Sequence, residues 1–177
     1  GYLYNIVMAR GSDPIAFGEV TTLASVIVTA CLPSSLLNLA VAQLLRHHNH
    51  SREIEKLLQL AALLFGVLTA FILLMSHSLW ETPFVEANKL SLLLIQLIVI
   101  PAYLNPLLYA MMLGRGQYIL SSLMLPLPNI LKFIFLLSFF IFFPPLRNVY
   151  GGLIAMASSI WFTLGIGYLF IGRRQVA

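Results

Sequence analysis

A lysine inside an apolar segment is the residue of this chain best placed to do chemistry. Lys132 lies within the apolar stretch 119–143, and a charge near the centre of a membrane-spanning helix costs about 2.5–3.5 kcal/mol on insertion scales. At about 1.5 Å per residue it lies ~21 Å beyond Tyr118, too far for its side chain to reach the nearer membrane surface easily. We therefore expect a specific interaction to offset its charge.

Two polar residues share the predicted helix face of Lys132. Ser122, Asn129 and Lys132 are spaced seven and then three positions apart, which places them on one side of a helix. This spacing predicts a polar cavity in which Lys132 attracts an anion, such as the phosphate of a lipid-linked substrate. The alternative is a structural ammonium that bonds to carbonyls freed by Pro126 or extends toward the membrane surface.

Weaker polar signals lie on the apolar segment 90–113. Gln96 and Tyr103 are seven residues apart and share one face, so both are candidates to line the same lumen, while Asn105 and Tyr109 lie on another face. Hydrogen bonding between helices is the more common use of such side chains. In the last apolar segment a row of small residues at steps of four predicts close helix packing: Gly151, Ala155, Ser159, Thr163 and Gly167.

No group of residues in the chain predicts catalysis. GxSxG, HExxH and P-loop motifs are absent from the sequence, as is any pair of intramembrane carboxylates, so we expect neither enzyme activity nor a cofactor. His47, His48 and His50 lie at a loop edge without a nearby cysteine, which is more typical of solvated histidines than of a metal site. We expect Glu55 in the same loop to be solvated as well.

The amino-acid composition of the chain excludes a soluble domain. Of the 177 residues, 60% are hydrophobic and 9% charged, with a mean hydropathy of +0.94, whereas soluble domains are about half apolar and a quarter charged. Apolar runs of about 20 residues fit spanning helices rather than the alternating strands of a barrel. The net charge is +4, but the basic residues are scattered between apolar runs, which argues against a nucleic-acid partner.

The apolar runs predict a single transmembrane domain over residues 1–177. Its fold class is all-α, a polytopic membrane helical bundle of about six transmembrane helices, the first of them truncated. The predicted spans are 1–8 (partial), 19–45, 57–75, 90–113, 119–143 and 151–171.

The distribution of basic residues predicts an orientation in the membrane. Most Lys and Arg residues lie in the loops 46–56 and 113–118 and in the C-terminal segment. Because short basic loops stay in the cytoplasm, we expect these three regions on the cytoplasmic side, with Trp80 and Tyr150 at the outer interface.

Several short motifs are spread along most of the chain: YNI at 4–6, AR at 9–10, DPIAFGE at 13–19, LGRGQY at 113–118 and VYGGLIA at 149–155. These motifs resemble those of one family of membrane transporters, the polysaccharide flippases of the multidrug/oligosaccharidyl-lipid/polysaccharide exporter superfamily. The nearest branch is that of the O-antigen and teichoic acid exporters. Their order and spacing are similar to those of the amino-terminal lobe of these proteins.

This resemblance implies a transporter of two six-helix lobes around a cavity that opens alternately to each side. The implied function is translocation of polyprenyl-diphosphate-linked sugars across the bacterial cytoplasmic (inner) membrane. The implied partners are the lipid bilayer, the lipid-linked oligosaccharide substrate, and a missing second lobe or a second copy of the chain. Basic lumen residues engage the diphosphate in this family, and Lys132 occupies a suitable position for that role.

Two other functions stay open from the sequence. A multidrug cation antiporter of the same superfamily needs intramembrane carboxylates, whereas each Asp and Glu here lies at the end of a span. A non-transporting membrane scaffold would use the row of small residues for packing alone. The run Asn105 to Tyr109 also matches the NPxxY pattern of rhodopsin-like receptors, but two further spans follow it, which disfavours a receptor.

Overall fold

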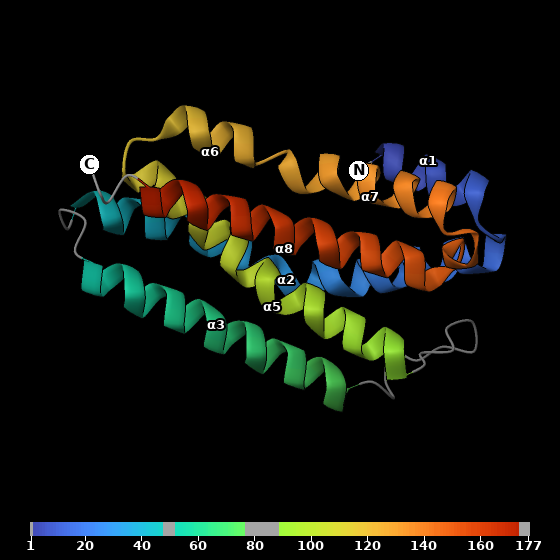
Figure 1. Ribbon diagram of the computed structural model, residues 1–177. Helices are drawn as coiled ribbons and strands as arrows, with labels where there is room; N and C mark the ends of the chain where they lie inside the picture. The colour runs from blue at the N-terminus through green and yellow to red at the C-terminus, as the bar shows by residue number, and fades with distance from the viewer. Residues whose placement is uncertain (1, 48–51, 77–88, 174–177) are drawn as a thin grey trace.

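The computed structural model describes residues 2–47, 52–76 and 89–173, and every regular element in these ranges is a helix. Figure 1 shows the long helices running side by side as a bundle. The elements are α1 (Tyr2–Gly11), α2 (Pro14–His47), α3 (Arg52–Met75), α5 (Lys89–Gly114), α6 (Tyr118–Met124), α7 (Leu127–Phe142), the short 3₁₀ helix η1 (Pro144–Leu146) and α8 (Val149–Arg173).

Five stretches of the described chain are long and apolar enough to cross a membrane. They are Pro14–Leu45, Glu53–Met75, Leu90–Gly114, Tyr118–Phe142 and Val149–Ile171. The predicted partial span 1–8 corresponds to α1, which has 10 residues and is too short to cross a bilayer. The prediction of an all-α membrane bundle is therefore confirmed, and the chain is a multi-pass membrane protein whose partner is the lipid bilayer.

Helix α5 lies at the centre of the bundle. Half of the residues in its apolar 18-residue stretch are buried inside the bundle. The corresponding share is 11% for α3 and 11% for the span that contains α6 and α7. Helix α5 packs against α2, α3 and α8, and α8 packs in turn against α7. Apolar side chains cover the exposed surface of α3, as expected for a peripheral helix that faces lipid.

The predicted span 119–143 is not one continuous helix. Helix α6 ends at Met124 and α7 begins at Leu127, because Pro126 and Pro128 have no N–H to donate to the carbonyls of the preceding turn. The last helical hydrogen bond before the break is donated by the Leu125 N–H to the Ser121 carbonyl. The helical pattern resumes where the Ile130 N–H donates to the Pro126 carbonyl. The break separates Ser122 from the face of α7, which corrects the single face predicted for 122, 129 and 132.

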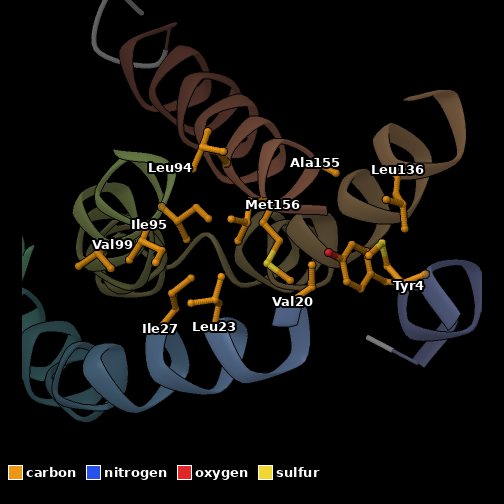
Figure 2. Close-up of a cluster of buried hydrophobic side chains, with 14 of the residues drawn as sticks. Tyr4, Val20, Leu23, Ile27, Leu94, Ile95, Val99, Leu136, Ala155 and Met156 are labelled. Carbon is orange, nitrogen blue, oxygen red and sulfur yellow. The ribbon is translucent and has the colours of Figure 1, made fainter. Parts of the chain in front are cut away.

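The larger apolar core lies where α1, α2, α5, α7 and α8 meet. Figure 2 shows the side chains that converge there, among them Tyr4, Leu23, Val99, Leu136 and Met156. Each of these is at most 5% exposed except Met156, at 8%. This core holds the short helix α1 against the bundle and so fixes the position of Tyr4.

The small-residue row of α8 packs as predicted. Ala155, Ser159 and Thr163 are at most 1% exposed. At Gly167 an added Cβ would lie only 2.5 Å from the Leu108 side chain of α5, so the absence of a side chain lets the two helices approach closely. At Gly152, beside the row, an added Cβ would lie 2.9 Å from the Tyr4 hydroxyl.

Candidate functional site

Lys132 lies at a cavity of about 160 Å³ between four helices. The cavity is lined by Ala24, Ile27 and Val28 of α2, Ile98 of α5, Pro128, Asn129 and Lys132 of α7, and Met156, Ser159 and Ile160 of α8. Val28 is 63% exposed and Asn129 is exposed, so the cavity opens to the exterior between α2 and α7. The structure thus brings Lys132 and Asn129 together at one opening, as the sequence predicted for this pair.

An aromatic ring accompanies the Lys132 ammonium. Its Nζ lies 4.5 Å from the centroid of the Tyr4 ring, within the range of a cation–π interaction. Tyr4 is 2% exposed, and its hydroxyl donates a hydrogen bond of 3.1 Å to the Gly152 carbonyl. The ring is therefore fixed between α1 and α8, and Figure 2 shows it pointing into the core with its oxygen toward α8.

The charge of Lys132 is not neutralised by a carboxylate in the part of the chain that the structure describes. The only ion pair recorded there joins Arg115 to Glu55. A cation–π interaction contributes about 0.5–2 kcal/mol, whereas removing an ammonium from water costs several kcal/mol. An anion that entered the cavity would meet the positive charge of Lys132 there.

The remaining predicted site residues lie elsewhere. Ser122 is exposed on α6, and Gln96 is half-buried on α5; neither lines the cavity at Lys132. Tyr103 is 5% exposed, donates to the Ala30 carbonyl at 2.9 Å and accepts from the Thr69 hydroxyl at 2.9 Å. Tyr103 therefore joins α5 to α2 and α3, which is the interhelical use that is common for such residues.

Tyr4 and Ser159 are the site residues that the sequence did not single out for Lys132. The sequence placed Ser159 only in the row of small residues that packs α8 against its neighbours. In the structure the same residue also lines the cavity. Tyr4 lies in the resemblance motif at 4–6, but no periodicity relates it to α7, because the contact joins segments that are far apart in the sequence.

A second polar site lies at the end of the bundle where α3 begins and α5 ends. Arg115 donates to both oxygens of the Glu55 carboxylate, at 3.0 Å from Nε and 2.5 Å from a terminal nitrogen. Glu55 is 5% exposed, so the expectation of a solvated carboxylate was wrong; the Arg115 guanidinium reaches it and replaces water. Planar two-point bonding of this kind fixes α3 against the turn between α5 and α6.

The predictions about the histidines and Trp80 fall largely outside the described residues. His48, His50 and Trp80 are not described, nor is the side chain of His47. Within the described ranges no group of three or more His, Cys, Asp or Glu side chains is placed to hold a metal.

Comparisons of the chain with protein-family models, with curated proteins and with solved structures find no match. The motifs at 4–19, 113–118 and 149–155 are thus the only link to the polysaccharide flippases, and the structure itself establishes a multi-pass helical membrane protein.

Proposed function

We propose that this chain is part of a transporter that moves polyprenyl-diphosphate-linked sugars across the bacterial cytoplasmic membrane. In this proposal Lys132 binds the diphosphate while the isoprenoid chain stays in the surrounding lipid. The observation that carries the proposal is the position of Lys132: its ammonium lies at an opening between α2 and α7 and has an aromatic ring beside it.

The chemistry of the cavity favours a diphosphate over a cationic substrate. A lysine ammonium donates up to three hydrogen bonds and accepts none, so it attracts anions and repels organic cations. Asn129 lies one turn from Lys132 at the cavity, with an amide that can donate to a phosphate oxygen. The motifs that resemble polysaccharide flippases add support, because a lumenal cation for the diphosphate is part of that family's pattern.

Alternating access requires more than the five spans described. We propose that a second lobe, or a second copy of the chain, faces the opening between α2 and α7 and completes the cavity. The end of the bundle that carries Glu55 and Arg115 would then face the cytoplasm, since the loops 46–56 and 113–118 and the C-terminal segment together hold six of the ten Lys and Arg residues.

Binding of a short polyprenyl diphosphate to the protein in detergent tests the proposal. Farnesyl diphosphate should bind, and farnesol, which lacks the anion, should bind much more weakly. Lys132→Met should weaken diphosphate binding by about 10- to 100-fold, because hydrogen bonds to charged groups contribute about 1.5–3 kcal/mol. Lys132→Arg should retain most of the affinity because it keeps the positive charge.

Lys56→Met is the matched control, since Lys56 is exposed at the start of α3. It removes the same charge from the chain and should leave binding unchanged. Equal affinity in Lys132→Met and Lys56→Met would exclude Lys132 as the diphosphate ligand and leave it a structural residue.

A further inference from the structure

Two buried polar residues lie one helical turn apart on α5. Asn105 is 6% exposed and Tyr109 is 7% exposed. They are four residues apart, so they lie on the same face of α5, about 5–6 Å apart at their Cβ atoms. Neither the Asn105 Oδ1 atom nor the Tyr109 hydroxyl has a hydrogen-bond partner among the described residues.

Hydrogen bonds connect this pair to the Lys132 cavity on one side and to α6 on the other. The Asn105 amide donates to the carbonyl of Ile160, at 3.5 Å, and Ile160 lines the Lys132 cavity. On the other side the Ser121 hydroxyl donates to the Tyr109 carbonyl, at 3.5 Å. One turn before Ser121, the buried Oε1 of Gln117 also lacks a partner among the described residues.

The two unpartnered groups on α5 are complementary. The Asn105 Oδ1 atom only accepts hydrogen bonds, while the Tyr109 hydroxyl both donates and accepts. A buried water needs two to four polar partners, and each of these two atoms can supply one. Buried polar groups without protein partners are generally satisfied by such internal water.

From this placement we infer that α5, α6 and α8 enclose a file of internal water that runs from the Lys132 cavity past Asn105 and Tyr109 toward Gln117. Asn105 and Tyr109 are the residues that bind it. The file gives the cavity a polar route to the end of the bundle that carries Arg115, separate from the opening between α2 and α7. This inference goes beyond the proposed transport function, because it holds whether or not the cavity binds a diphosphate.

Hydroxyl-radical footprinting by X-ray radiolysis of water tests this inference on the protein in detergent. Radicals form from water at the site, so a buried side chain is modified only where water lies against it. Tyr103 is the matched control: it is buried to a similar degree on the same helix, but protein groups satisfy its hydroxyl. Tyr109 should be modified several times faster than Tyr103, and equal rates would overturn the inference.

Two variants complete the test. Asn105→Leu removes one water ligand, so Tyr109 modification should fall to the Tyr103 level while the Tyr103 rate, which reports on intact packing, stays unchanged. If Tyr109 is modified as fast as before, the file does not depend on Asn105 and the assignment fails. Tyr109→Phe should lower the midpoint temperature of thermal unfolding, because the water loses a hydrogen-bond partner. A higher midpoint would show that no water was bound to the hydroxyl.

Discussion

Lys132 contacts a residue near the start of the chain, far from it in the sequence. The Tyr4 ring lies against its ammonium, and the Tyr4 hydroxyl is anchored on Gly152. The lysine is therefore positioned by two helices besides its own, at the lining of the cavity. This arrangement lets the ring and the hydroxyl of Tyr4 be tested separately.

Replacing Tyr4 with Phe should cost about 1 kcal/mol of unfolding free energy, because it removes one buried hydrogen bond and keeps the ring. Replacing Tyr4 with Leu should cost more, since the cation–π interaction is lost as well. In a double-mutant cycle with Lys132→Met, Tyr4→Leu should show a coupling of about 0.5–2 kcal/mol. Thermal or denaturant unfolding in detergent measures these values; a coupling near zero would mean that the ring does not stabilise the ammonium.

The ion pair between Arg115 and Glu55 should be among the most important polar contacts for stability. Arg115→Met leaves the Glu55 carboxylate buried without its partner, which typically costs about 3–5 kcal/mol. Adding Glu55→Gln should recover part of that loss, since the uncompensated charge disappears. If unfolding of Arg115→Met matched that of the exposed control Lys56→Met, the pair would be solvated in the membrane-bound protein.

Helix contacts depend on which glycine of α8 faces a neighbour. Gly167→Ala places a Cβ against Leu108 and should destabilise the bundle by about 1–3 kcal/mol through overpacking. Gly165, two residues earlier, is exposed and has nothing within 4 Å of an added Cβ. Gly165→Ala should therefore be neutral, or stabilising by up to about 1 kcal/mol from helix propensity. Unfolding of the two variants side by side checks this, and equal effects would contradict the close contact of α5 and α8.

The sequence predicted the positions of the helices better than the contacts between them. Long apolar runs bounded by polar loops predict helices because a bilayer leaves few other ways to satisfy the backbone. The break at Pro126 was harder to place, since a membrane helix tolerates proline when neighbours cover its carbonyls, as the continuous α2 does at Pro33. Helical spacing therefore related Asn129 to Lys132 correctly but extended the face too far, to Ser122.

Contacts between distant segments could not be predicted from spacing. Periodicity describes one helix at a time, whereas the Lys132 cavity needs α2, α5, α7 and α8 together, with Tyr4 of α1 against the lysine. Glu55 shows the same limit: a carboxylate in a polar loop looks solvated until the partner that buries it, Arg115, is known.

At the scale of the whole molecule, the proposed orientation places opposite ends of the bundle on opposite sides of the membrane. In a Cys31→Ser background, Tyr118→Cys should react with a membrane-impermeant maleimide only after the cells are permeabilised. Asn148→Cys, between the other end of that span and the start of α8, should react in intact cells. The two residues are exposed and partly exposed, respectively, so access itself is not limiting. The reverse pattern would invert the proposed topology.

The most direct test of the whole account is photocrosslinking of the intact protein with a polyprenyl diphosphate that carries a photoreactive group beside its phosphates. We predict crosslinks on the part of α7 that contains Asn129 and Lys132 and on the cavity-lining part of α8. An excess of unlabelled farnesyl diphosphate should compete for these crosslinks, and Lys132→Met should remove them. Crosslinks confined to the lipid-facing surface of α3 and insensitive to competitor would contradict an anion site at Lys132.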